Sequence, residues 1–143
     1  MNNTITVLIN ELEIPVRFNE ADPLGVVWHG HYLRYFEDGR EAFGKDYAIS
    51  YLDFYRNNIA VPVVSVQCDY KRPLHYGDTL LLKTIFQPVP AAKLLFRYEI
   101  YHADRKDLIA TGNTTQVFVD AKSFELHLIV PEFFQQWRDK WHV

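Results

Sequence analysis

A single long amphipathic helix, predicted over residues 30–47, is the feature that most constrains the fold of this chain. Its apolar positions are spaced by four, three and four residues, and they are Tyr32, Phe36, Gly39 and Phe43. At 3.6 residues per turn this spacing forms one stripe, which has to be buried against another element. A glycine inside a helix costs about 1 kcal/mol relative to alanine. We therefore expect a neighbouring element to pack closely against the helix at Gly39.

Most of the remaining chain alternates apolar and polar residues, which is typical of half-buried strands. Strands are predicted over residues 11–18, 61–70, 79–86, 93–102 and 108–119. Pro15 favours an edge position or a strand start for the first of them. Short helices are predicted over residues 49–57 and from Pro131 through Trp137, with Pro131 at the first helical position. This order predicts an α+β fold in which an antiparallel sheet of about five strands wraps around the long helix.

Length and charge narrow the class of protein. The 143 residues contain no linker, repeat or low-complexity tract, so one domain spanning 1–143 is expected. The net charge of −3 and the lack of a basic stripe argue against a nucleic-acid partner. No apolar run approaches the roughly 20 residues that span a bilayer, and residues 1–10 lack the features of a secretory signal. A cytoplasmic location is the default expectation, and the one cysteine, Cys68, is expected to be a buried free thiol.

One carboxylate, Asp22, lies in a Pro/Gly loop just before the long helix. A helix start presents backbone N–H donors and the positive end of the helix dipole. A carboxylate beside it therefore combines a base or nucleophile with a cradle for a developing oxyanion. The alternative is structural, because Asp before Pro is a common turn former and Asp near a helix start is a common N-cap.

The same loop carries a longer motif, Glu20-Ala-Asp22-Pro-Leu-Gly25-Val-Val-Trp28-His29-Gly-His-Tyr32. A second segment reads Asp69-Tyr-Lys-Arg72-Pro-Leu-His-Tyr-Gly77-Asp78. Both segments resemble the hotdog-fold acyl-CoA thioesterases of the 4-hydroxybenzoyl-CoA thioesterase type, and equally the short-chain thioesterase associated with the Tol–Pal system. In that family the first motif reads Asp/Glu-x-Asp-x-x-Gly-Val-Val, an aromatic, His or Tyr, two free positions and Tyr. The predicted order of elements matches the family over nearly the whole chain.

The resemblance implies a hotdog fold and hydrolysis of an acyl-CoA thioester to free acid and CoA. It implies that Asp22 is the catalytic carboxylate and that the backbone N–H of His29 polarises the thioester carbonyl. It also implies a dimer or a dimer of dimers (a homotetramer), with pockets at subunit junctions. No metal or redox cofactor is implied, since coenzyme A is part of the substrate.

Substrate-binding roles are expected for Gly25, Trp28, Tyr32, Lys71 and Arg72. Gly25 suits a tight turn or a close approach of ligand. Tyr32 either orders the site from its helix face or is a core tyrosine. Lys71 and Arg72 either contact the phosphates of coenzyme A or are solvated charges. The 4-hydroxybenzoyl-CoA enzyme places basic residues where this chain has Val89-Pro-Ala-Ala92, so its phosphate contacts and its aromatic substrate do not carry over directly.

Two other groups near Asp22 admit more than one interpretation. Glu20 is expected to be a solvated loop carboxylate, and an acid/base pair with Asp22 is the alternative. His29 and His31 do not have the spacing of a metal-ligand signature with Asp22, and their rings are expected to point apart, so no metal is expected.

Two other functions fit the same fold. A hotdog dehydratase or hydratase would pair a His with a carboxylate for proton transfer at carbon. A non-catalytic acyl-CoA binding module is the other, because fold alone does not confer function. Release of free thiol distinguishes a thioesterase from both.

Overall fold

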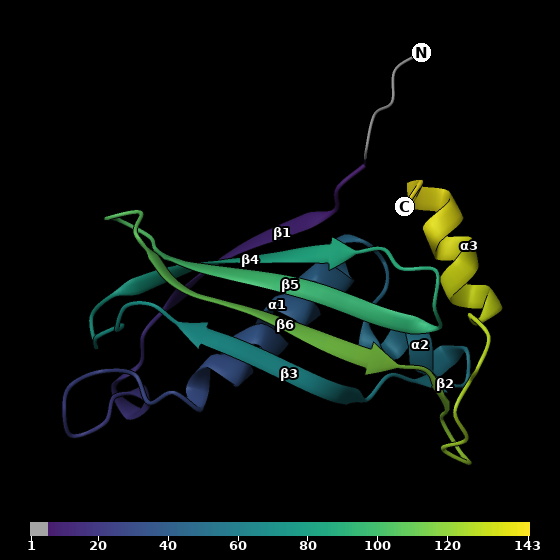
Figure 1. Cartoon of the computed structure of the whole chain (residues 1–143), viewed down its shortest axis with the longest axis horizontal. Helices are drawn as coiled ribbons and strands as arrows, with labels where there is room; N and C mark the ends of the chain where they lie inside the picture. The colour runs from purple at the N-terminus through teal and green to yellow at the C-terminus, as the bar shows by residue number, and fades with distance from the viewer. Residues whose placement is uncertain (1–5) are drawn as a thin grey trace.

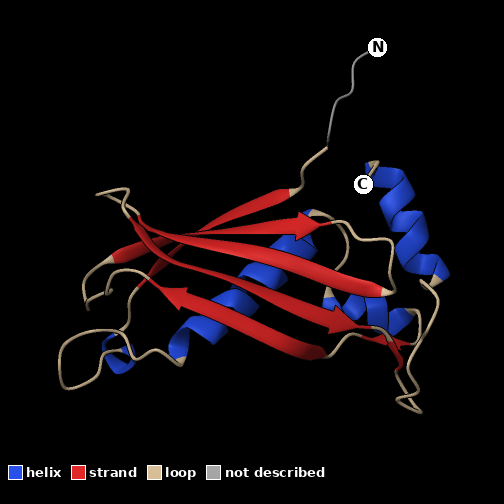
Figure 2. Cartoon of the chain, in the orientation of Figure 1, coloured by secondary structure: helices blue, strands red, loops and turns tan. Residues whose placement is uncertain are grey.

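The computed structural model describes residues 6–143, so the first half of the segment considered for a secretory signal, residues 1–5, lies outside it. Helix α1 (His31–Asp46) lies along one face of a five-stranded antiparallel sheet (Figures 1 and 2). The strand order is β1-β4-β5-β6-β3. The strands are β1 (Ile9–Pro15), β3 (Val63–Tyr70), β4 (Thr79–Gln87), β5 (Lys93–His102) and β6 (Leu108–Val117). The predicted α+β architecture, five strands around one long helix, is confirmed.

The predicted apolar stripe of α1 is buried against the sheet. Phe36 and Phe43 are fully buried, and the Phe36 ring stacks on Tyr98 of β5 with 4.2 Å between ring centroids. At Gly39 a Cβ atom would lie 2.8 Å from Leu82 Cδ2 and would overlap Thr84 Oγ1. The close packing expected at Gly39 is therefore confirmed, because the helix backbone rests directly on β4.

The two edges of the sheet differ from the predicted strands. Strand β1 is an edge strand, as Pro15 suggested, but it starts at Ile9 and ends at Pro15 rather than covering 11–18. The next residues form a short 3₁₀ helix, η1 (Phe18–Glu20). Strand β3 is the other edge, and its residues are mostly exposed on both faces because α1 covers little of it. Cys68 is consequently half-buried, and the prediction of a buried thiol was wrong.

Shorter elements close the ends of the sheet. Helix α2 (Tyr51–Arg56) is shorter than predicted, since Ser50 caps it and its side chain accepts a hydrogen bond from the Asp53 N–H. The last predicted strand stops at Val117, and the next residues form β7 (Val119–Asp120), which pairs with β2 (Ile59–Ala60). Helix α3 (Glu132–Trp141) follows Pro131, which is the N-cap rather than the first helical residue. Over residues 6–143, none of the helices has the length and apolar character needed to cross a membrane.

Candidate active site

The loop between β1 and α1, which carries Asp22, lies at the end of the molecule opposite α3 (Figure 1). Ala21 and Val27 form an isolated antiparallel bridge, and the Asp22 N–H donates to the Val26 carbonyl at 2.8 Å. Gly25 closes the turn with a φ of 82°, a conformation that other residues rarely adopt. The half-buried Asp22 side chain accepts a hydrogen bond from the Leu24 N–H at 2.9 Å through Oδ1. The loop therefore fixes one carboxylate oxygen and leaves Oδ2 without a protein donor among the described residues.

The chain enters α1 through a turn with open backbone donors. The His31 N–H donates to the Trp28 carbonyl at 3.0 Å, and α1 begins at His31, two residues after His29. Gly30 is the N-cap, it provides no side-chain cap, and the first turn contains no acidic residue. The N–H groups of His29 and Gly30 donate to no acceptor within residues 6–143. Free donors at the positive end of a helix favour a negatively charged oxygen.

Tyr70, at the end of β3, orients this turn. Its hydroxyl donates to the His29 carbonyl at 2.7 Å, which fixes the peptide plane that carries the Gly30 N–H. Burial, followed by the contact with Cys68, raises the pKa of Tyr70 to about 12, so the hydroxyl is protonated at neutral pH. From the sequence Tyr70 is predicted only as a strand residue, with no role in the site. No local signal indicates this contact, because 41 residues separate the two partners.

The Asp22 carboxylate and the open amides of the helix start are not hydrogen-bonded to each other within the described residues of one copy. The Asp22 carboxylate bonds to Leu24, and no hydrogen bond joins it to the amides of His29 or Gly30 anywhere in the described chain. Backbone pairing puts Asp22 at the closed end of the loop, whereas Trp28, whose N–H donates to the Glu20 carbonyl, is at the open end. The loop therefore carries the carboxylate and the helix start on one continuous segment.

Glu20 is a buried structural carboxylate rather than the expected solvated one. Its side chain is only 3% exposed, and it lies in η1 rather than in a strand facing Asp22. Oε1 accepts from the Arg17 N–H at 2.7 Å and Oε2 from Arg34 Nη2 at 2.5 Å. Burial opposes ionisation, but these two donors outweigh it and hold the pKa of Glu20 below its ordinary 4.5. Glu20 thus fastens the base of the Asp22 loop to α1.

We expect Glu20→Gln to destabilise the protein by about 1–3 kcal/mol at neutral pH, because it removes the charge that satisfies buried donors. A carboxyl with a depressed folded pKa stabilises the fold above its ordinary pKa, and this contribution is lost as pH falls through the folded value. The difference in unfolding free energy between the two proteins should therefore shrink below pH 4.5. Urea unfolding between pH 3 and 7 measures it. Glu13→Gln, on the exposed face of β1, is the matched control, and an equal loss there would contradict the assignment.

The other predicted site residues surround the same helix start. The indole of Trp28 is half exposed and contacts the rings of both His29 and His31, at 4.9 and 5.5 Å between centroids. Tyr32 is a core residue, 3% exposed, and its ring meets that of Tyr70 edge-on at 4.9 Å. It therefore supports the residue that orients His29.

Lys71 and Arg72 are exposed and directly follow Tyr70. Their N–H groups both donate to the Ile109 carbonyl, at 2.8 and 3.0 Å, so the backbone is fixed and the side chains extend outward. Neither side chain forms a salt bridge with a residue of the described range. Arg97 on β5, in contrast, is paired with Glu99 at 2.6 Å.

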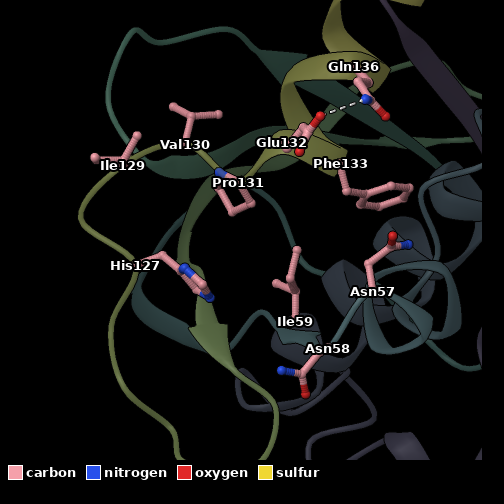
Figure 3. Close-up of a pocket in the computed structure, with 10 residues that line it drawn as sticks. All are labelled: Asn57, Asn58, Ile59, His127, Ile129, Val130, Pro131, Glu132, Phe133 and Gln136. Atoms are coloured by element: carbon pink, nitrogen blue, oxygen red, sulfur yellow. Dashed lines mark hydrogen bonds between the residues drawn. The ribbon is translucent and has the colours of Figure 1, made fainter.

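Two cavities lie away from Asp22, and neither has Asp22 or His29 in its lining. An open cavity of about 610 Å³ lies beside the start of α3, where Glu132 Oε1 accepts a hydrogen bond from Gln136 Nε2 at 3.2 Å and the rings of His127 and Phe133 face the cavity (Figure 3). A mostly apolar cavity of about 510 Å³ lies between α1, α2 and the sheet. We call this second space the inner cavity; Tyr51 and Phe54, two aromatic residues of α2, contribute to its wall.

Comparison with known proteins finds similarity to thioesterases in both sequence and fold. The model of the Thioesterase-like superfamily matches residues 16–138. The Bacillus subtilis protein named "Putative acyl-CoA thioesterase YneP" is 33% identical over 135 residues, which cover 94% of each chain. A 1,4-dihydroxy-2-naphthoyl-CoA hydrolase from Nostoc punctiforme is 31% identical over 123 residues, covering 85% of this chain and 81% of that protein. The solved structure of a DHNA-CoA thioesterase from Staphylococcus aureus superposes with a TM-score of 0.78 at 25% identity, covering 96% of this chain and 87% of the other.

Proposed function

Because this chain belongs to the thioesterase-like superfamily and is a thioester hydrolase of the hotdog fold, we propose that it cleaves an acyl-CoA thioester to free acid and CoA with Asp22 as its reactive carboxylate. The observation that carries the proposal is the uncapped start of α1, whose open amides follow the rigid Asp22 loop directly. Cleavage of a thioester needs both a nucleophile or base and donors for the carbonyl oxygen. This segment supplies both groups.

The amides of His29 and Gly30 are assigned to the carbonyl oxygen of the thioester. Negative charge grows on that oxygen as the tetrahedral intermediate forms, and fixed N–H donors stabilise it without reorganising. Tyr70 contributes by holding the His29 carbonyl, so that the following N–H keeps its direction. Donors of this kind contribute on the order of 10² or more to kcat.

Asp22 can act by two routes. It attacks the carbonyl carbon, the C–S bond breaks, CoA leaves as a thiolate, and water then opens the mixed anhydride. Alternatively, it removes a proton from a bound water, whose hydroxide attacks the carbonyl carbon and expels the thiolate, which takes up the proton. Both routes use only protein groups and water. A rapid-quench search for the mixed anhydride on Asp22 distinguishes them.

Coenzyme A is assigned to the surface beside the end of β3. Lys71 and Arg72 extend their side chains there, next to Tyr70, and provide charges for phosphate groups. Trp28, with half of its indole exposed, offers a flat apolar surface close to the backbone amides of His29 and Gly30. The space beside the loop tip is open, because a Cβ added at Gly25 would meet nothing within 4 Å.

A second copy of the chain is expected to complete the site by pairing along β3. This edge strand offers unpaired backbone groups, and its apolar residues are exposed: 38% for Val63, 59% for Val64 and 42% for Val66. Exposed apolar side chains on an open sheet edge mark an interaction surface. An antiparallel two-fold pairing would bring the Tyr70 end of one strand beside the Val63 end of the other. The His29 turn of one copy would then adjoin the inner cavity of its partner.

Thiol release from a panel of short, long and aryl acyl-CoA thioesters tests the proposed function. We expect stoichiometric CoA and free acid from at least one class, with kcat well above the rate in buffer. Hydration of an enoyl-CoA without thiol release would instead identify a hydratase. Binding of several thioesters without turnover would identify a binding module, and either result would overturn the proposal.

A further inference from the structure

We propose that Asp78 and His102, which we call the buried pair, are positioning residues that hold the Asp22 loop in place for thioester cleavage. This inference rests on the proposed function, because it concerns the placement of the same reactive carboxylate. Of the six histidines in the chain, only His102 is buried. Neither route of cleavage described above uses it. Its contacts lead instead, through Asp78, to the backbone of the Asp22 loop.

Asp78 is connected to both stems of the Asp22 loop. On the first stem, the N–H of Val16, the residue directly after β1, donates to the Asp78 carbonyl at 2.9 Å. On the second stem, Val26 forms an antiparallel bridge with His75, and the His75 N–H donates to Asp78 Oδ2 at 2.9 Å. The Asp22 N–H in turn donates to the Val26 carbonyl. Only Val26 and His75 therefore separate the Asp78 carboxylate from the backbone of Asp22.

The segment that carries Asp78 is a tight turn against the second stem. The Asp78 N–H donates to the His75 carbonyl at 3.0 Å, and Gly77 has a φ of 95°. A positive φ at the third position of such a turn favours glycine. The Val27 N–H donates to the carbonyl of the fully buried Leu74 at 2.8 Å. The second sequence motif, which ends in Gly77-Asp78, thus forms a support on which the loop rests.

His102, at the end of β5, holds the other oxygen of the Asp78 carboxylate. Its Nδ1 accepts from the N–H groups of Asp104 and Arg105, at 3.2 and 3.0 Å. A ring nitrogen that accepts carries no proton, so in the neutral ring the proton is on Nε2. Nε2 lies 3.3 Å from Asp78 Oδ1. Burial opposes ionisation, but the His75 N–H and His102 outweigh it and hold the pKa of Asp78 below its ordinary 3.8.

Loosening the buried pair should affect the chemical step more than the binding of coenzyme A. A displacement of about 1 Å in a reacting group can cost about a hundredfold in rate. The residues assigned to coenzyme A are fixed separately, since the N–H groups of Lys71 and Arg72 donate to the Ile109 carbonyl. Loss of the contact within the pair should therefore displace Asp22 and leave those charges in place. The expected result is a lower kcat with a nearly unchanged KM.

Two substitutions of His102 separate its contact with Asp78 from its contact with the turn between β5 and β6. His102→Asn places an oxygen near the position of Nδ1, where it can accept from the turn, but its side chain is too short to reach Asp78. His102→Gln places an N–H donor near the position of Nε2 and removes the acceptor for the turn. We expect His102→Asn to lower kcat by about tenfold or more with KM within about twofold, and His102→Gln to keep kcat within about threefold. A purely structural role in the turn predicts the reverse order.

A matched pair of carboxylate substitutions controls for general loss of stability. Asp78→Asn should lower kcat as His102→Asn does, and it replaces that variant in both measurements if His102→Asn does not fold. Asp120 is also a turn carboxylate, whose Oδ1 accepts from the N–H groups of Lys122 and Ser123, both at 2.9 Å. It lies in β7, away from the Asp22 loop. Asp120→Asn should keep kcat within about twofold, whatever its effect on Tm.

Amide hydrogen exchange measures the hold on the loop without relying on activity. In His102→Asn the amides of Asp22 and Val27 should exchange about tenfold faster or more, because the loop opens more readily. The amide of Ala121, which donates to the Asn58 carbonyl, should exchange at its original rate.

The outcomes separate this inference from the proposed function. Unchanged exchange at Asp22 and Val27, or a kcat lower in His102→Gln than in His102→Asn, would overturn the positioning role and leave the thioesterase standing. Absence of CoA release from every thioester with the unmodified protein would overturn the proposed function. The exchange rates would then still decide whether the buried pair holds the loop.

Discussion

Asp22→Asn is expected to lower kcat for acyl-CoA hydrolysis by at least about a hundredfold while the fold stays intact. Asparagine keeps the size of the side chain and an oxygen that can accept from the Leu24 N–H, so the loop geometry is retained. It removes the negative charge on which both the nucleophilic and the general-base routes depend. Thiol release under saturating substrate measures kcat, and thermal unfolding followed by circular dichroism checks the fold.

The matched control for this substitution is Asp104→Asn. Asp104 is exposed in the turn between β5 and β6, and the same loss of charge there should leave kcat within about twofold. A Tm difference between Asp22→Asn and the unmodified protein of more than a few degrees would indicate a structural effect instead. Unchanged kcat with an unchanged Tm would remove Asp22 from the chemistry altogether.

The second large effect is expected at the open edge of the sheet, where Val66→Glu should separate the two copies of the proposed dimer. Val66 lies near the middle of β3, so two-fold pairing would bring its side chain close to that of the partner. A glutamate on each copy would then place like charges together in an apolar interface. We expect the mass in solution to fall from dimer to monomer. We also expect kcat/KM to fall by at least about a hundredfold, because each site would lose half of its groups.

Ile9→Glu provides the control on the opposite edge. Ile9 is in β1 and is 39% exposed, close to the 42% of Val66, so both substitutions add a charge at a similar depth. The Ile9 variant should keep the mass and the activity of the unmodified protein. Light scattering and thiol release on the same samples decide the question. A monomeric Ile9 variant with a dimeric Val66 variant would show that the copies pair through the other edge.

The spacing of apolar residues was enough to predict how α1 packs against the sheet. The stripe from Tyr32 to Phe43 appears as the buried face of α1, and the misfit glycine at position 39 predicted the contact with β4. These features follow from local spacing, because residues three and four positions apart lie on the same face of a helix. The strand over 93–102 was also placed correctly, since its alternation is uninterrupted and β5 is a central strand that pairs with β4 on one side and β6 on the other.

The details of the site depended on contacts that local sequence does not encode. Glu20 looked solvated because its partner, Arg34, comes 14 residues later and one helical turn into α1. Tyr70 looked like an ordinary strand residue because the His29 carbonyl that it binds is 41 residues away. The alternation of residues in β3 predicted one buried face, but most of its residues are exposed because β3 lies at the edge of the sheet. Which strand lies at the edge depends on the order of all five strands, and local sequence does not give that order. The helix start was displaced from residue 30 to His31 because Trp28 and His31 form their own turn.

The contact at Gly39 also limits how this enzyme can diverge. The backbone of α1 rests on Leu82 and Thr84 at this position. Position 39 already has the smallest residue, so no substitution there can bring the helix closer to the sheet. Natural variation in substrate choice among descendants of this chain should therefore concentrate in α2 and at the end of β6, where side chains line the inner cavity. The spacing between helix and sheet is expected to be inherited unchanged.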